Sequence, residues 1–312
     1  MNNLLIISEQ AAQYEKLITA QTLPDLNIHL AQDTEQAKDV INDVNIILGQ
    51  PALIAPLLKY ASKLQWVQST FAGVEALCQP KLRTDYCLTG VKAVLGPLMS
   101  EYVFTYILAL ERHIFTTQKH QHNQLWHSLP YRSLTGLTIG ICGLGSIGQA
   151  IAKTAAHFQM KVLGLSRTAK PMQYIDKVYS PDNICELAQQ VDYLITVLPH
   201  TKHTQHMINE KVLQALGSNG VLMNVGRGAI IDEQALIESL RNKQIRGAVL
   251  DVFQTEPLPN DSPFWTLDNV LITPHNAAVS FPEDIYKIFC DNYLRFTQQQ
   301  PLEYLINFDD GY

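Results

Sequence analysis

The chain has 312 residues, of which 46% are hydrophobic and 17% are charged, so it is long enough for roughly two globular domains. Its net charge of −6 argues against a nucleic-acid partner, and no apolar run approaches the ~20 residues of a membrane-spanning helix. The five cysteines form no C-x-x-C pair, and the first residues lack the basic start of a signal peptide. We therefore expect a cytoplasmic protein that binds neither nucleic acid nor a membrane.

The first hundred residues alternate short apolar runs with segments, such as 9–19 and 34–42, whose apolar spacing fits amphipathic helices. The candidate strands are 4–7, 28–30, 44–48, 66–69 and 87–90. Such alternation predicts a parallel sheet that helices cover on both faces. This region contains no phosphate-binding loop of its own.

An apolar-rich stretch from residue 97 to about residue 118 predicts one long helix. The segment 120–132 that follows is polar but contains Trp126 and Pro130, and we expect it to form an arm or loop. It leads into a second alternating region, which begins near residue 137.

The second region predicts a doubly wound dinucleotide-binding sheet, because six candidate strands are joined by helical crossovers. The candidate strands are 137–142, 161–166, 193–198, 221–225, 248–251 and 270–273. The helical patterns between them are 147–158, 181–190, 209–215 and 233–241, and a last helix is expected from 282 to about 299. The segment after that helix is too short for a domain, so we expect it to pack on the first region.

A glycine fingerprint, G-x-G-x-x-G, follows the first of these strands and opens a helical pattern. Gly143 permits the tight turn, Gly145 lets the backbone approach a pyrophosphate, and Gly148 permits close packing of helix and strand. Ser146 and Ile147 begin the helix, whose amino end offers N–H groups to phosphate. The motif alone is weak evidence, but its place between a strand and a helix favours a cofactor site over a structural turn.

The end of the next strand indicates which dinucleotide binds. NAD-dependent enzymes usually place an acid there to bind the ribose 2′-hydroxyl. This chain has Ser166, Arg167 and Thr168 instead, followed closely by Lys170. A guanidinium pairs well with a 2′-phosphate, so we expect NADP as the preferred cofactor, with NAD possible.

Three further motifs contain an arginine, a glutamate and a histidine: Arg227 in N-V-G-R-G, Glu256 in D-V-F-Q-T-E-P and His275 in T-P-H-N-A-A. An arginine can bind a carboxylate through two parallel hydrogen bonds. A histidine can protonate a carbonyl oxygen while a glutamate keeps that imidazole protonated. Taken singly, His275 could be a capping residue and Glu256 a solvated loop acid. The glycines around Arg227 are harder to explain by packing alone.

Together these motifs resemble the D-isomer-specific 2-hydroxyacid dehydrogenases, most closely the glyoxylate/hydroxypyruvate reductase branch. The strong resemblance covers residues 134–278, and a weaker one lies at 69–74. It implies a flavodoxin-like substrate domain (residues 1–98 and 280–312) and a Rossmann cofactor domain (99–279), both doubly wound α/β, with the active-site cleft between them. Members usually form homodimers.

By this resemblance, Arg227 binds the substrate carboxylate, His275 donates a proton to the keto oxygen, and Glu256 hydrogen-bonds His275. The resemblance also implies that the backbone of Ala72 and Gly73 holds the carboxylate. It implies that Leu198 and Pro199 line the cofactor cleft and that Asp251 faces the nicotinamide carboxamide. Trp126 would border the substrate pocket of the partner subunit. The expected reaction is reduction of a small 2-keto acid, such as glyoxylate or hydroxypyruvate, to the D-2-hydroxy acid by hydride transfer from NADPH.

Two alternatives stay open at this point. One is an NADH-dependent reductase of a larger branched or aromatic 2-keto acid, because the sequence does not give the volume of the pocket. His200 and Asn276 also stand where the family more often has apolar or small residues, which leaves the polarity of the pocket and its substrate preference open. The other is a dinucleotide-sensing interaction protein of the corepressor type, which keeps the same three residues. His200, His203 and His206 lie on a polar loop without a cysteine or an H-E-x-x-H motif, so we expect no metal site.

Overall fold

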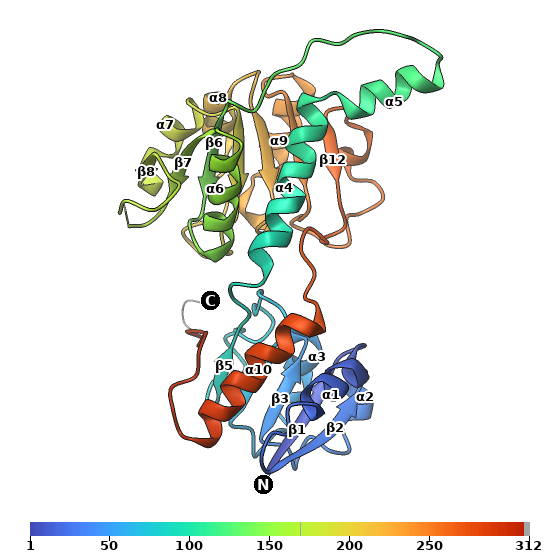
Figure 1. Cartoon of the computed structure of the whole chain (residues 1–312), viewed down its shortest axis with the longest axis vertical. Coiled ribbons are helices and arrows are strands. Elements are labelled where there is room, and N and C mark those ends of the chain that lie inside the picture. The colour runs from blue at the N-terminus through green and yellow to red at the C-terminus, as the bar shows by residue number, and fades with distance from the viewer. Residues whose placement is uncertain (169, 309–312) are drawn as a thin grey trace. The chain divides into compact units, whose positions relative to one another are not determined.

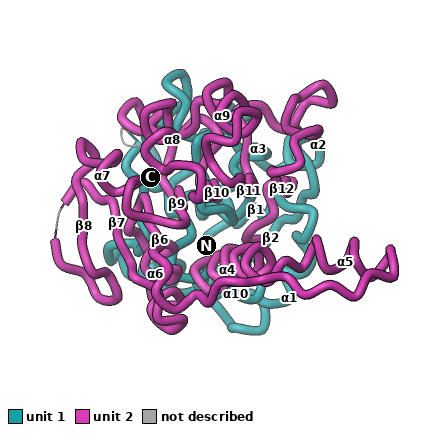
Figure 2. The backbone as a smooth tube through the Cα atoms, turned by 90° about the horizontal axis from the view of Figure 1, so that it is seen from above, with its two compact units in different colours: residues 1–94, 280–312 teal, residues 95–279 magenta. Residues whose placement is uncertain are grey.

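The computed structural model of the chain describes residues 1–168 and 170–308, which fall into two compact units (Figure 2). The first unit contains residues 1–94 and 280–312, and the second contains residues 95–279. Residues 95–98, which the sequence placed in the substrate domain, form the start of a helix of the second unit. Among the described residues, no helix has the length and apolar character needed to cross a membrane.

The described residues of the first unit form a five-stranded parallel sheet in the order β2-β1-β3-β4-β5. Its strands are β1 (Asn2–Ile7), β2 (Leu26–Ala31), β3 (Ile46–Gly49), β4 (Trp66–Ser69) and β5 (Cys87–Thr89). This order is that of flavodoxin-like folds. β1, β3 and β4 are buried almost throughout, which is why they read as continuous apolar runs in the sequence.

Helices cover both faces of this sheet, with α1 and α10 on one side and α2 and α3 on the other (Figure 2). Their bounds are α1 (Ala11–Thr19), α2 (Thr34–Ala37), α3 (Pro51–Ile54) and α10 (Pro282–Thr297), with a 3₁₀ turn at Ala55–Leu57. Trp66 stacks on Phe289 and Phe296 of α10, with ring centroids 5.2 and 5.6 Å apart. After α10, Ile306 donates its N–H to Leu88, so the end of the chain packs on this unit as predicted.

The described residues of the second unit form a seven-stranded parallel sheet in the order β12-β11-β10-β9-β6-β7-β8. Its strands are β6 (Thr138–Cys142), β7 (Lys161–Leu165), β8 (Lys177–Tyr179), β9 (Tyr193–Thr196), β10 (Val221–Asn224), β11 (Gly247–Leu250) and β12 (Val270–Ile272). This is the Rossmann order with one further strand, so the predicted fold class of two doubly wound parallel sheets is confirmed. The prediction of six strands was wrong by one, because β8 is a three-residue edge strand with little apolar signal.

Two apolar cores lie on the two faces of this sheet. The helices are α4 (Leu95–Glu111), α5 (Ile114–His122), α6 (Ser146–His157), α7 (Ile184–Ala188), α8 (Glu210–Leu216) and α9 (Glu233–Arg241), with 3₁₀ turns at Pro181–Asn183, Gly228–Ile230 and Pro263–Thr266. Side chains of α4 and α6 contribute to one core, and those of α7, α8 and α9 contribute to the other. Loops after the strands therefore project from a rigid, doubly covered sheet.

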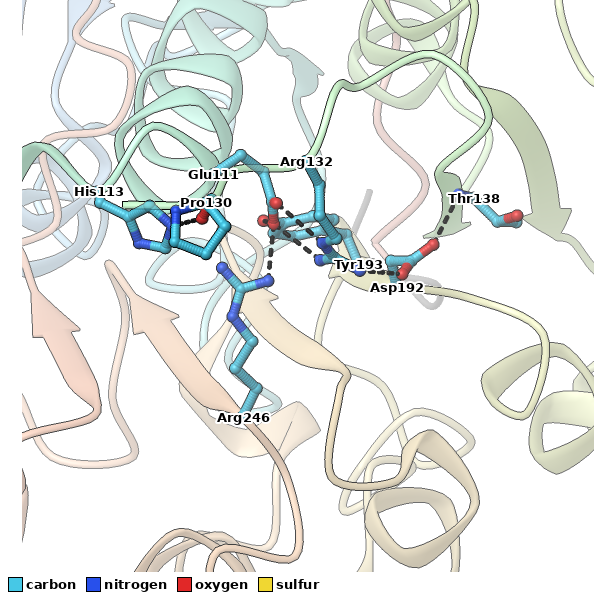
Figure 3. Close-up of polar contacts among 8 residues, drawn as sticks. All are labelled: Glu111, His113, Pro130, Arg132, Thr138, Asp192, Tyr193 and Arg246. Atoms are coloured by element: carbon cyan, nitrogen blue, oxygen red, sulfur yellow. Dashed lines mark hydrogen bonds and ion pairs between the residues drawn. The ribbon is translucent and has the colours of Figure 1, made fainter. Parts of the chain in front are cut away.

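The single helix predicted for residues 97–118 was wrong, because α4 ends at Glu111 and α5 starts at Ile114. His113 between them adopts a left-handed backbone (φ 54°), which interrupts the helical path. None of the residues of α5 is buried, and the helix projects from the unit (Figure 1). Its chain returns to the body at Pro130, whose carbonyl lies 2.7 Å from His113 Nε2 (Figure 3).

Candidate active site

The glycine-rich turn after β6 has room for a ligand at one glycine and none at the other two. A Cβ on Gly148 would lie 2.0 Å from the carbonyl oxygen of Gly143, and a Cβ on Gly143 would lie 2.8 Å from that of Val197. Gly143 also has a φ of +105°. A Cβ on Gly145 would meet no described atom within 4 Å. The fold itself therefore needs Gly143 and Gly148, whereas Gly145 leaves open space where a pyrophosphate fits.

Gly145 is also the N-cap of α6, so Ser146 and Ile147 lie in the helix's first turn. N–H groups in that turn have no partner within the helix and suit phosphate oxygens. The residues present thus fit a dinucleotide.

The segment after β7 stands where the ribose of a dinucleotide would lie. Ser166 is partly buried and donates its N–H to Tyr179, and its hydroxyl accepts the N–H of Thr168 at 3.4 Å. Arg167 and Thr168 are exposed. None of these three side chains is acidic, so the segment offers a guanidinium and two hydroxyls.

Arg227 lies in the loop after β10, between two glycines that the fold requires. A Cβ on Gly226 would lie 2.8 Å from the Leu198 carbonyl oxygen, and a Cβ on Gly228 would lie 1.9 Å from the Phe253 carbonyl carbon. The loop therefore packs directly on the backbones that follow β9 and β11. Arg227 is partly buried in an extended conformation, and its Nη1 donates to the Gly226 carbonyl at 2.7 Å.

Glu256 and His275 form a hydrogen-bonded pair. Nδ1 of His275 lies 2.7 Å from Oε2 of Glu256, and the other oxygen, Oε1, accepts the N–H of Phe253 at 2.9 Å. The side chain of His275 is 51% exposed and that of Glu256 is 35% exposed. No described residue hydrogen-bonds Nε2 of the imidazole. Because Nδ1 faces a carboxylate, Nε2 is the nitrogen available to a substrate.

His275 adopts a left-handed backbone (φ 52°), and Asp251 holds the turn that contains it. The Asp251 carbonyl accepts the N–H of His275, and its buried carboxylate accepts the N–H groups of Asn276 and Ala277 at 2.9 and 3.1 Å. The hydroxyl of Thr273 donates to the same carboxylate at 2.6 Å. That Asp251 faces the nicotinamide carboxamide stays a prediction; the structure shows its oxygens engaged with this turn.

Tyr102 of α4 extends this network, since its hydroxyl lies 2.6 Å from Thr273 Oγ1. The Tyr102 hydroxyl is protonated at neutral pH and can donate to Thr273, and burial raises its pKa further above the ordinary value. A cavity of about 540 Å³ lies beside the pair, lined by Asp251, Glu256, Thr273 and His275 and by apolar side chains that include Leu258 and Trp265. The two acids and the histidine therefore border one space.

The other predicted residues fall in two places. Leu198 and Pro199 follow β9, and the Leu198 backbone packs on Gly226, in the same group of loops as Arg227. Ala72 and Gly73 lie in the first unit, in the turn after β4, where Ser69 Oγ accepts the N–H of Phe71. The roles of these residues in binding stay predictions.

The sequence analysis gave no role to Thr196 or to Asn224, the last residues of β9 and β10, although Asn224 opens the motif that contains Arg227. They are fully buried register partners, and the Thr196 hydroxyl donates to Asn224 Oδ1 at 2.6 Å. A polar residue that closes an apolar strand is the signal that could have found them, because the carboxyl ends of parallel strands meet at one edge.

Comparison with known proteins finds a matching family model and several relatives. A family model described as the NAD binding domain of D-isomer specific 2-hydroxyacid dehydrogenases matches residues 104–277. A glyoxylate reductase of Pyrococcus furiosus is 32% identical over 88% of this chain and 84% of its own length.

Two solved structures are similar over nearly all of both chains. A D-isomer specific 2-hydroxyacid dehydrogenase family protein of Aeromonas salmonicida is 44% identical with a TM-score of 0.95, covering 99% of each chain. An NADPH-dependent glyoxylate/hydroxypyruvate reductase of Sinorhizobium meliloti, solved with NADP and sulfate, is 26% identical with a TM-score of 0.88, covering 100% of each chain.

Proposed function

Because the chain belongs to the D-isomer-specific 2-hydroxyacid dehydrogenase family, we propose that it reduces a small 2-keto acid, such as glyoxylate or hydroxypyruvate, to the D-2-hydroxy acid with NADPH. The observation that carries this proposal is the 2.7 Å hydrogen bond between His275 and Glu256 beside a dinucleotide-fitting sheet edge. The relatives named as glyoxylate reductases support the substrate class.

Arg227 and His275 have different roles in the reaction. Arg227 binds the substrate carboxylate through two parallel hydrogen bonds, and the packed glycine loop fixes its backbone. A nicotinamide held at the glycine-rich turn would supply the hydride that reduces C2 of the keto acid. His275 donates the proton on Nε2 to the keto oxygen and is left neutral with a proton on Nδ1.

Glu256 orients the imidazole of His275. Its Oε2 accepts the hydrogen bond from the Nδ1–H group, which fixes the tautomer that remains after His275 has given up its Nε2 proton. The N–H of Phe253 orients the carboxylate for this contact.

The preference for NADPH is proposed from the end of β7. Ser166, Arg167 and Thr168 offer hydroxyls and a guanidinium to a 2′-phosphate, and no carboxylate among them would repel it. The similarity to an NADPH-dependent reductase solved with NADP supports the same choice.

A panel of 2-keto acids, assayed by loss of reduced-nicotinamide absorbance with NADPH and with NADH, tests the proposal. We expect the highest kcat/KM for two- and three-carbon keto acids with NADPH, and a D-2-hydroxy acid as product. Turnover confined to branched or aromatic keto acids with NADH would favour the larger-substrate alternative. Cofactor binding without turnover of any keto acid would favour the sensing protein.

We also propose that the chain forms a homodimer through the arm at residues 114–129. Trp126 is fully exposed, and Ile114, Phe115 and Leu125 are exposed on the same segment, which projects from its unit (Figure 1). Several large exposed apolar side chains on one projecting segment suit an interaction surface, and closed two-fold dimers are the commonest oligomers. Sedimentation of the whole chain at micromolar concentration should give twice the 35.0 kDa chain mass; a monomer would contradict the proposal.

A further inference from the structure

We propose that Asn224, with Thr196, positions Arg227 to bind the substrate carboxylate. The inference rests on the proposed function, because Asn224 acts only through Arg227, the residue proposed to bind the substrate carboxylate. Asn224 itself does not contact the substrate. Asn224 opens the N-V-G-R-G motif that contains Arg227, but the resemblance gives it no role, and Thr196 lies outside the three motifs.

The Asn224 amide is wholly buried and makes three hydrogen bonds. Its Oδ1 accepts the N–H of Gly226 at 3.1 Å and the hydroxyl of Thr196 at 2.6 Å, and its Nδ2 donates to the Arg227 carbonyl at 2.9 Å. One side chain thus holds the peptide groups on both sides of the Gly226–Arg227 link. These bonds fix the direction in which the chain leaves β10.

The arginine side chain bonds the peptide that lies between these two. Nη1 of Arg227 donates to the Gly226 carbonyl at 2.7 Å, so the guanidinium is oriented against a peptide whose neighbours on both sides are bonded to Asn224. Gly226 has no side chain that could restrict its own backbone. We therefore infer that the amide restricts the backbone of Gly226, and that this restriction reaches the guanidinium.

An amide suits this position because it both donates and accepts. An aspartate would keep the acceptor for Gly226 and Thr196, but it would lose the donor to Arg227 and bury a charge. Thr196, at the end of the neighbouring β9, supplies the hydroxyl that occupies the second lone pair of Oδ1. The pair therefore links the arginine loop to the centre of the sheet.

The alternative is that Asn224 only stabilises the end of β10. The two roles predict different effects on the free energy of unfolding and on kcat/KM. A stabilising role lowers the free energy of unfolding and leaves the kcat/KM of the folded enzyme intact. A positioning role lowers kcat/KM for keto acids and weakens binding of a carboxylate inhibitor, while the Kd for NADPH stays the same.

The first test uses a matched pair of Thr196 variants in the full chain. Thr196→Val keeps the shape but removes the donor, and we expect kcat/KM to fall roughly 5- to 10-fold, as for one lost buried hydrogen bond. Oxalate inhibition should weaken by a similar factor. Thr196→Ser keeps the hydroxyl and should recover most of the loss. Equal kcat/KM for the two variants and the wild type would overturn the proposal.

The second test is a double-mutant cycle with Arg227. Asn224→Ala should lower kcat/KM roughly 100-fold in the wild type but less than about 3-fold in Arg227→Ala, because residues that act as one unit are not additive. Equal losses in both backgrounds would overturn the positioning role while the proposed function stands. An Arg227→Ala enzyme with full kcat/KM would overturn the proposed function, and the positioning role with it.

Discussion

The two ends of the second unit's sheet each contain a glutamate that accepts hydrogen bonds, and the two glutamates differ in burial. At the amino ends of the strands, Glu111 has a side chain that is 3% exposed and accepts hydrogen bonds from Arg132, Arg246 and Tyr193 (Figure 3). At the carboxyl ends, Glu256 is 35% exposed and accepts from one imidazole and one backbone N–H.

The Glu111 cluster joins segments that are distant in sequence. Arg132 follows the arm and also donates to Asp192 at 2.8 Å, whose other oxygen accepts the N–H of Thr138, the first residue of β6 (Figure 3). All three nitrogens of the Arg132 guanidinium thus donate to a carboxylate. Nε2 of the His275 imidazole instead has no hydrogen-bond partner among the described residues. The comparison suggests that the buried glutamate serves stability and the exposed one serves chemistry.

The largest effect that would test this division is at His275. His275→Ala should lower kcat/KM for the keto acid by roughly 10²- to 10⁴-fold, the usual contribution of a general acid. The free energy of unfolding should stay within about 0.5 kcal/mol, because the side chain is half exposed. Initial rates and thermal unfolding measure the two quantities. His203→Ala, on an exposed loop, is the control; activity within threefold of wild type at His275→Ala would contradict the role.

Glu111→Gln should show the opposite pattern. Removing the buried charge leaves Arg132 and Arg246 without their carboxylate, but these are 40% and 29% exposed, so water compensates part of the loss. We expect the free energy of unfolding to fall by about 2–3 kcal/mol, with the kcat/KM of the folded enzyme unchanged. Glu101→Gln, exposed on the same helix, is the control. A large loss of kcat/KM without loss of stability would contradict the division.

The same cluster predicts how stability depends on acid. Burial would raise the pKa of Glu111, but hydrogen bonds from Arg132, Tyr193 and Arg246 outweigh it and lower the pKa from 4.5 to about 2. A depressed carboxyl pKa gives stability that is present above pH 4.5 and lost as the pH falls toward 2. Between pH 4.5 and 2, the free energy of unfolding should therefore fall more steeply with falling pH for the wild type than for Glu111→Gln.

The difference between the two ends also explains what the sequence could predict. The predicted strands lie within two residues of those observed, because buried parallel strands read as apolar runs. Arg227, Glu256 and His275 stand in local motifs, so they could be named before the fold was known. Their catalytic roles stay predictions, although the expected contact between Glu256 and His275 is present at 2.7 Å.

Features that depend on tertiary contacts could not be predicted. The partners of Glu111 lie 21, 82 and 135 residues away in the sequence, and no local pattern pairs them. The break at His113 was missed because Ile114 and Phe115 continue the apolar pattern, although both are exposed. The contacts of Asn224 could not be predicted from its motif, because the pairing of β9 with β10 brings Thr196 to it.

The smallest expected effect lies in the glycine-rich turn at the carboxyl end. Gly145→Ala adds a methyl group where no described atom lies within 4 Å, at a backbone (φ −72°, ψ −166°) that alanine adopts easily. The free energy of unfolding should change by less than about 0.5 kcal/mol. The Kd for NADPH should rise roughly tenfold, because the methyl group occupies the space where the pyrophosphate approaches the backbone. Fluorescence titration with NADPH measures the Kd.

Gly148→Ala is the matched control, since its methyl group would lie 2.0 Å from the Gly143 carbonyl oxygen and should destabilise the fold itself. Loss of NADPH binding in a fully stable Gly145→Ala protein, beside an unstable Gly148→Ala protein, would separate the glycine that the ligand needs from the one that the sheet needs. If Gly145→Ala bound NADPH with wild-type Kd, the space above this glycine would not be where the phosphates bind. The carboxyl end of the sheet would then lack the open cofactor surface that distinguishes it from the Glu111 end.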